Sequence, residues 1–176
     1  MLLSLFVIMG EQRWKTMEKY YQNMLNYIHS HKLIKQMILF INHYFTYFMY
    51  IIYPLILIYL LMTKNQLFLV TLIKPLLAFS IVTIIRKFIN RKRPYETMKI
   101  KALFSHKSGQ SFPSRHTVSA MIIALVCFDI HIVLGSFLLF IALCISLGRV
   151  LAGVHYISDV IVAMIIAFII YLLKIF

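Results

Sequence analysis

Residues 117–148 read TVSAMIIALVCFDIHIVLGSFLLFIALCISLG. Two apolar runs, 117–130 and 132–148, are separated only by a short polar step that holds Asp129 and His131. A helix that crosses a bilayer needs roughly 20 predominantly apolar residues, and both runs approach that length. Because so few residues join them, we expect a tight hairpin of two membrane-spanning helices.

Further apolar runs flank this hairpin. Residues 37–62 and 66–85 precede it, and residues 160–173 follow it. The chain is 62% hydrophobic, whereas roughly half is typical of a soluble domain. The sequence therefore predicts an all-α, polytopic transmembrane helical bundle of about five to six spans.

The first 36 residues differ from the rest of the chain. Residues 1–10 are apolar but too short to cross a bilayer, and they lack the basic start and cleavage site of a signal peptide. Residues 11–36 mix lysines with aromatic and aliphatic side chains, which is typical of an amphipathic helix in the interface. We therefore divide the chain into an N-terminal interfacial segment, 1–36, and a membrane-embedded domain, 37–176.

Positive charge is concentrated in one loop. The chain has 18 Lys and Arg residues against five Asp and Glu, and nine of the 18 lie between Arg86 and Arg115, where Glu96 is the only acid. Between apolar spans, such a loop is expected to meet lipid head groups or phosphates rather than nucleic acid. Charge alone is equally consistent with a loop that only fixes topology.

Two polar clusters enclose this loop. In RKFINRKRP, residues 86–94, Arg86 and Arg93 are seven apart and would share a helical face, with Pro94 ending the helix. In SFPSRHT, residues 111–117, Ser114 is a good N-cap, and His116 in the first turn would face a bound anion and donate a proton. Each cluster alone also fits a simpler reading, an interfacial anchor or an ordinary helix cap.

A third cluster, GRVLAGVHYISD, occupies residues 148–159. His155 and Asp159 are four apart, so on a helix they share a face and can form a hydrogen bond. A carboxylate on one ring nitrogen fixes the tautomer and leaves the other nitrogen as a nucleophile or base. No His-Glu-x-x-His pair or set of cysteine ligands is present, so we predict neither a metal nor another cofactor.

Together the three clusters resemble the tripartite signature of the type-2 phosphatidic acid phosphatase superfamily, which includes the vanadium haloperoxidases and bacterial membrane lipid phosphatases. The family pattern is Lys-x6-Arg-Pro, then Pro-Ser-Gly-His, then Ser-Arg-x5-His-x3-Asp. The matching residues, in order and with the same spacing, are Arg93 and Pro94, then Pro113, Ser114 and His116, then Arg149, His155 and Asp159. The continuous apolar spans exclude a soluble haloperoxidase.

The resemblance implies an integral-membrane, metal-independent phosphatase that acts through a phosphohistidine. His155 would attack phosphorus, Asp159 would orient the attacking ring, and His116 would protonate the leaving oxygen and later activate water. The residues implied to hold the phosphate oxygens are Arg86, Arg93, Ser114, Arg115 and Arg149. The substrate would be a lipid phosphate or pyrophosphate, such as undecaprenyl pyrophosphate, phosphatidylglycerophosphate or phosphatidate.

The sequence departs from the family pattern at three positions. Arg86 replaces Lys, which keeps the charge but changes its reach and geometry. Arg115 replaces Gly, which restricts the backbone and adds a cation, and Gly148 replaces Ser, which removes a possible hydrogen bond. These changes bear on rate and substrate preference more than on the class of reaction.

The alternative is a non-catalytic membrane protein, a transporter or scaffold that binds anionic lipid head groups. That reading leaves the His155–Asp159 spacing unexplained. In either case we expect a multi-pass protein of the cell membrane whose partners are lipids and not nucleic acid, and the sequence does not indicate an oligomeric state. Family analogy places the site on the extracytoplasmic side, whereas two spans before Arg86 and the positive-inside rule favour the cytoplasm.

Overall fold

The computed structural model of the protein describes residues 2–105 and 108–174, with the backbone alone for residues 2–11 and 13. The elements in chain order are α1 (Leu2–Ser30), α2 (Lys32–Phe40), the π-helical turn η1 (Ile41–Phe45), α3 (Thr46–Met62), α4 (Leu67–Ile89), α5 (Pro94–Thr97), α6 (Arg115–Phe128), α7 (Ile132–Leu151) and α8 (Ile157–Leu172). The described part of the chain contains no β-strand, which confirms the predicted all-α class.

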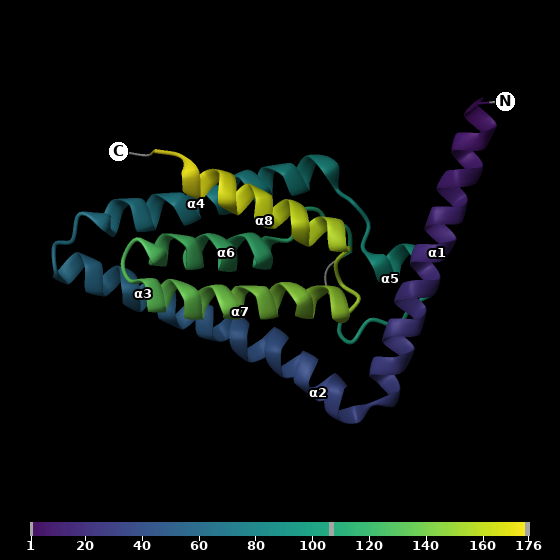
Figure 1. The fold of residues 1–176 in the computed structure, drawn as a ribbon, viewed down its shortest axis with the longest axis horizontal. Helices are drawn as coiled ribbons and strands as arrows, with labels where there is room; N and C mark the ends of the chain where they lie inside the picture. Colours follow the sequence, from purple (N-terminus) through teal and green to yellow (C-terminus); the bar gives the residue numbers. More distant parts are fainter. Residues whose placement is uncertain (1, 106–107, 175–176) are drawn as a thin grey trace.

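Three stretches within the described residues are long and apolar enough to cross a membrane. They are Lys32–Met62 (α2, η1 and α3), Leu67–Thr97, which begins with α4, and Ile132–Leu151, which is α7. The apolar helices α6 and α8 are shorter, and α6 packs against α4, α7 and α8 in the middle of the bundle (Figure 1). The predicted transmembrane bundle is therefore confirmed.

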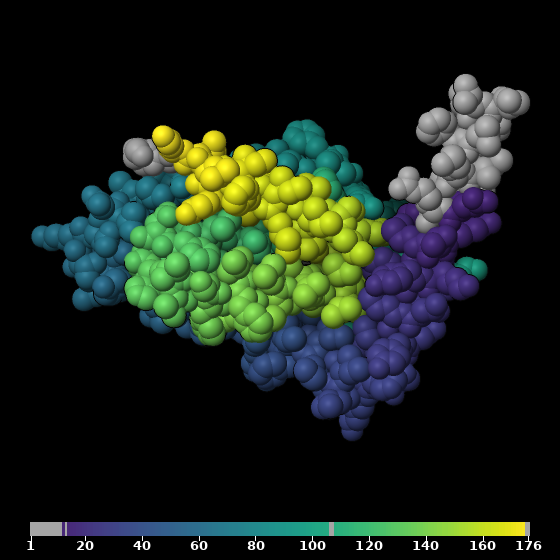
Figure 2. Space-filling model, viewed as in Figure 1, coloured from purple at the N-terminus to yellow at the C-terminus, as the bar shows by residue number. Residues whose placement is uncertain are grey.

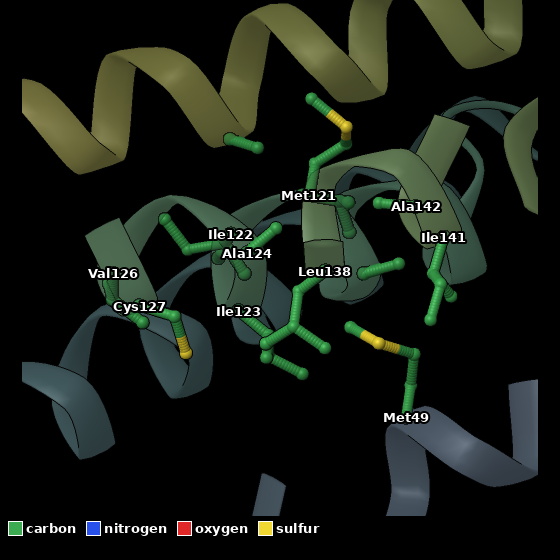
Figure 3. Close-up of a cluster of buried hydrophobic side chains, with 14 of the residues drawn as sticks. Met49, Met121, Ile122, Ile123, Ala124, Val126, Cys127, Leu138, Ile141 and Ala142 are labelled. Carbon is green, nitrogen blue, oxygen red and sulfur yellow. The ribbon is translucent and has the colours of Figure 1, made fainter. Parts of the chain in front are cut away.

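The core is built around α6. Ile122 and Ala124 of this helix are fully buried, and they lie beside Leu138 and Ala142 of α7 and Met49 of α3 (Figure 3). Inside a membrane the hydrophobic effect does not drive helices together, so association depends on close packing, which small residues such as alanine allow. The tight packing of α6 fixes the position of its N-terminus, where the second polar cluster begins.

The predicted hairpin between α6 and α7 is also present. His131 caps α7, because its Nδ1 accepts a hydrogen bond from the backbone N–H of Val133 at 3.3 Å. A Cβ added to Gly135 would lie 2.6 Å from Cγ of Phe128, so the close approach of the two helices requires glycine there.

Helix α1 lies across one end of the bundle at a steep angle to the other helices (Figures 1 and 2). It is separated from α2 by a break at His31, and it buries Tyr21, Leu25 and Ile28 against the rest of the protein. Its opposite side exposes aromatic residues such as Tyr20 and Tyr27. The location of this segment in the membrane interface, and the division of the chain at residue 36, stay predictions.

The antiparallel order of the helices brings the three polar clusters to the end of the bundle that α1 crosses. The C-terminal ends of α4 and α7 and the N-terminal ends of α6 and α8 all lie there (Figure 1). In the described residues the first candidate span is Lys32–Met62, and the second, Leu67–Thr97, leads into the basic loop.

Candidate active site

The first cluster is not one continuous helix. Helix α4 ends at Ile89, because Asn90 adopts a left-handed conformation with φ 40° and donates its N–H to the carbonyl of Arg86. Arg93 instead sits at the N-cap position of the short helix α5. The prediction that Arg86 and Arg93 share a helical face is therefore wrong, although both residues reach the same site.

Both arginines are buried and held by backbone carbonyls. Nη1 of Arg86 donates to the carbonyl of Pro113 at 2.8 Å. Nη1 of Arg93 donates to the carbonyl of Val154 at 2.9 Å and lies 3.4 Å from Nε2 of His155. The Arg93 guanidinium thus stands beside the ring nitrogen that would attack phosphorus.

His155 and Asp159 are in contact, but not along one face of a helix. His155 precedes α8, and Asp159 lies in the first turn of α8, where its Oδ2 accepts the backbone N–H of Tyr156 at 3.0 Å. The distance from Nδ1 of His155 to the same oxygen is 3.3 Å. Because a carboxylate accepts and the Arg93 guanidinium donates, Nδ1 carries the ring proton and Nε2 presents its lone pair.

The burial of His155 favours the neutral imidazole. Its side chain is 1% exposed, and burial lowers its pKa from 6.5 to about 4. The nearby charges of Arg93 and Arg86 act in the same direction, and Asp159 opposes them. The neutral form is the one that can act as a nucleophile.

Two further residues hold Asp159, and the sequence analysis did not assign them to the site. Oγ of Ser111 donates to Oδ2 of Asp159, and Nη1 of Arg91 donates to Oδ1 at 2.8 Å. The Arg91 guanidinium also lies over the ring of Tyr156, 3.9 Å from its centroid. Both residues belong to the polar clusters identified in the sequence. Asp159 is more than 40 residues from each of them, so the local sequence pattern does not indicate these contacts.

The start of α6 is arranged as predicted. Ser114 is the N-cap, its Oγ accepts from the backbone N–H of Thr117 at 3.4 Å, and its own N–H donates to the carbonyl of Asp159 at 3.0 Å. Arg115 and His116 follow in the first turn and are half-buried. The second and third clusters are therefore joined directly.

Arg149 lies in the last turn of α7 and is also buried. Its Nη2 donates to Oγ1 of Thr46 at 3.2 Å, and the charge of Arg93 acts on it. The preceding residue, Gly148, packs against the side chain of Asn42 in η1, and an added Cβ would lie 2.7 Å from Nδ2 of Asn42. Asn42 thus fills the space that a serine at position 148 would need.

Helix α1 supports the loop that carries His155. The hydroxyl of Tyr21 donates to the carbonyl of His155 at 3.2 Å. Gly153 has φ +74°, and a Cβ there would lie 2.9 Å from Cδ1 of Leu25, so both its conformation and its contact with α1 favour glycine.

A groove of about 560 Å³ lies between α3, α4 and α6 and reaches the first turn of α6. Its lining is mostly apolar and includes Met49, Pro54, Leu76 and Phe79. Arg115 and His116 line the same groove. A ligand with a charged head and an apolar chain fits this combination of surfaces.

The charges of the site favour an anion. Five arginines lie in or around it, against the carboxylates of Asp159 and Glu96; the arginines are Arg86, Arg91, Arg93, Arg115 and Arg149. Glu96 is occupied by the backbone N–H groups of Arg93 and Gly109. Within residues 2–105 and 108–174, no three His, Cys, Asp or Glu residues are grouped as a metal site requires.

Comparison with known proteins gives consistent matches. The family model described as the PAP2 superfamily matches residues 56–175. A protein of Bacillus licheniformis named bacitracin transport permease protein BcrC is 28% identical over an alignment of 137 residues, and the match covers 74% of this chain and 65% of that protein. The chain thus spans slightly less than two thirds of this relative's length.

Two solved structures are also similar. The crystal structure of Aquifex aeolicus LpxE superposes with a TM-score of 0.71 at 26% identity, covering 87% of this chain and 90% of that one. A transmembrane PAP2-type phosphatidylglycerolphosphate phosphatase from Bacillus subtilis gives a TM-score of 0.65 at 17% identity, covering 96% and 92%. The second likeness supports the fold alone.

Proposed function

The chain belongs to the PAP2 superfamily, a family of phosphatases, and we propose that it is an integral-membrane phosphatase that hydrolyses a lipid phosphate or pyrophosphate through a phosphohistidine at His155. The observation that carries this proposal is the geometry of the His155 ring. Nδ1 of His155 lies 3.3 Å from Oδ2 of Asp159, and Nε2 lies 3.4 Å from Nη1 of Arg93. When the substrate binds, a phosphate oxygen would replace Nε2 as the partner of the Arg93 guanidinium.

In the first step, Nε2 of His155 attacks phosphorus. The N–P bond forms as the bond from phosphorus to the leaving oxygen breaks, and His116 donates a proton to that oxygen. Asp159 accepts the Nδ1–H throughout and stabilises the positive charge that develops on the ring. The fixed guanidinium groups of Arg86 and Arg93 bind the other phosphate oxygens as charge builds on them.

In the second step, His116, now neutral, takes a proton from a water molecule that attacks the phosphohistidine. The N–P bond breaks, inorganic phosphate leaves and the imidazole of His155 is restored. The arginines supply the positive charge on which phosphoryl transfer depends, so the reaction as proposed needs no metal ion.

The groove between α3, α4 and α6 would hold the lipid chain, since it is mostly apolar and begins beside His116. Undecaprenyl pyrophosphate, phosphatidylglycerophosphate and phosphatidate all combine a charged head with apolar chains. The site is proposed to open on the extracytoplasmic side of the cell membrane, as the family resemblance implies.

A non-catalytic lipid-binding scaffold or transporter is the competing function, and the name of the B. licheniformis relative describes transport. A scaffold needs cations that bind head groups, which the arginines provide. It gives no reason for a fully buried histidine whose ring is oriented by Asp159 and, through Asp159, by Ser111 and Arg91. This network favours catalysis.

The test is phosphate release in detergent with excess EDTA from the three candidate lipids. We compare the wild type with His155→Gln, which replaces the imidazole by an amide of similar size that cannot form a phosphoimidazole. Release should persist in EDTA and fall by at least about a thousandfold in the variant, because the nucleophile is lost. Rapid quenching with a ³²P-labelled substrate should trap an acid-labile, alkali-stable phosphoprotein only in the wild type.

The matched control is His131→Asn, which changes a histidine at the other end of the bundle and preserves the cap of α7. It should hydrolyse the lipids like the wild type. Hydrolysis that survives in a folded His155→Gln protein, or wild type that binds the lipids without hydrolysing any of them, would overturn the proposed function.

A further inference from the structure

Arg115 occupies the junction between the phosphate site and the apolar groove. Its charge acts on both Arg86 and Arg93. Its guanidinium also lies over the ring of Phe79, 5.9 Å from the centroid, on the groove wall formed by α4. The side chain therefore lies between the arginines proposed to bind the phosphate and the apolar groove.

The leaving group also lies on this side of the site. In the proposed mechanism His116 gives its proton to the leaving oxygen, and His116 lines the groove next to Arg115. The group attached to that oxygen, which carries the lipid chain, therefore extends into the groove past Arg115.

Lipid phosphates and lipid pyrophosphates differ in this leaving group. Cleavage of a monophosphate ester releases an alcohol whose leaving oxygen carries no phosphate, so no charge develops there for Arg115 to bind. Cleavage of a pyrophosphate breaks the bond between the attacked phosphorus and the bridging oxygen, and the leaving group is a lipid monophosphate on which negative charge builds. A cation beside that phosphate stabilises the transition state for the second substrate class only.

We propose that Arg115 binds the leaving phosphate of a lipid pyrophosphate and so gives the enzyme a preference for pyrophosphates over monophosphates of the same lipid. The inference rests on the proposed function and adds the substrate class to it. Arg115 stands where the family pattern has glycine, so reversal of this one residue should remove the preference.

The experiment compares kcat/KM for farnesyl pyrophosphate and farnesyl phosphate, which carry the same chain, in the wild type, Arg115→Gly and Arg115→Lys. Arg115→Gly should lower kcat/KM for the pyrophosphate roughly 10- to 100-fold, as expected for loss of a hydrogen bond to a charged group. The value for the monophosphate should fall by a clearly smaller factor, because that substrate has no second phosphate for Arg115 to bind. Arg115→Lys keeps the positive charge but loses the planar guanidinium that can donate two parallel hydrogen bonds, so it should retain part of the preference.

Lys92→Ala is the matched control, because it removes an exposed cation from the same basic loop. It should affect both substrates equally. An equal loss on both substrates in Arg115→Gly, or no loss on either, would overturn the inference and leave the phosphatase in place. Wild type that hydrolyses one of the three candidate lipids but neither farnesyl substrate would also overturn the inference. Wild type that hydrolyses none of these substrates and forms no phosphoprotein would instead overturn the proposed function. If Arg115→Gly does not fold, Arg115→Gln provides the same comparison.

Discussion

At the scale of single residues, the His155 side chain is deeply buried between one carboxylate, Asp159, and two guanidinium groups, Arg93 and Arg86. Burial, Arg93 and Arg86 favour the neutral ring, and Asp159 favours the charged one. The balance lowers the pKa of His155 from 6.5 to about 4, so the ring is neutral near pH 7, as its proposed role as the nucleophile requires.

This shift predicts how stability depends on pH. Between pH 6.5 and about 4 the unfolded chain protonates this histidine and the folded protein does not, so folding loses stability as pH falls through that range. The loss approaches about 3 kcal/mol at the acidic end, and above pH 6.5 this group contributes no pH dependence. Thermal midpoints measured in detergent from pH 4.5 to 8 should therefore fall more steeply at acidic pH in the wild type than in His155→Gln.

All other titratable groups are common to the two proteins, and of these Asp159 loses its contact with the imidazole in the variant. Parallel curves for the two proteins would show that the ring is not held neutral. A difference that develops above pH 7 would show that its pKa is raised rather than lowered.

The sequence predicted most of the residues that meet at the site, because the motif spacing reflects chemistry that this family reuses. It missed Ser111 and Arg91 as partners of Asp159. A hydroxyl or a guanidinium pairs with a carboxylate through the folded chain, and the contacts here join residues 48 and 68 positions apart. Nothing in the local pattern around Ser111 or Arg91 records those contacts.

At the scale of elements, the end of α4 shows why a local pattern can mislead. The run from Arg86 to Pro94 reads as a continuing helix, but Asn90 ends it. Oδ1 of Asn90 accepts the N–H of Gln110 at 3.3 Å, and the carbonyl of Arg91 accepts the N–H of Ser111 at 2.8 Å. These partners come from the far side of the loop, so the early stop depends on tertiary contacts.

The packing of η1 against α7 explains one departure from the family pattern and yields a prediction. A Cβ at Gly148 would lie 2.7 Å from Nδ2 and 3.3 Å from Cγ of Asn42, closer than buried atoms tolerate. Restoration of the family residue by Gly148→Ser should therefore destabilise the protein by about 1–3 kcal/mol. Because Arg149 follows directly, the shift should also reduce phosphatase activity.

A second substitution in η1, at Asn42, should relieve the destabilisation caused by Gly148→Ser. Asn42→Ala removes the amide that occupies the space, at the cost of its hydrogen bond to the carbonyl of Ile38. The double variant should recover at least about 1 kcal/mol relative to the sum of the single changes. Thermal midpoints of the four proteins measure this coupling, and additive effects would show that Asn42 and Gly148 do not compete for the same space.

At the scale of the whole molecule, the apolar runs predicted the spans. Backbone N–H and C=O groups inside a bilayer must form hydrogen bonds within the protein, and a single apolar segment can do so only as an α-helix. The position of α1 was not predictable in the same way. Amphipathicity indicates a surface helix but not the surface, and the contact of Tyr21 with His155 joins residues 134 positions apart. In the folded protein, α1 crosses the end of the bundle that holds the site.

This arrangement fixes which segments must share a side of the membrane. Since one span separates α1 from residues 63–66, and α4 returns the chain to the site, α1 and the basic loop lie on one side and residues 63–66 on the other. Single cysteines at Asn23 in α1, Ser108 in the loop and Lys64 in the turn, all exposed positions, report on the three segments. They are introduced after Cys127 and Cys144 have been changed to alanine in a variant that still hydrolyses lipid.

A membrane-impermeant maleimide applied to intact cells should label Asn23→Cys and Ser108→Cys and should reach Lys64→Cys only after permeabilisation. The reverse result would place the site on the cytoplasmic side. The arginines of the basic loop would then obey the positive-inside rule. Unequal labelling of Asn23→Cys and Ser108→Cys would contradict the fold itself, since α1 could not then lie against the loop that carries His155.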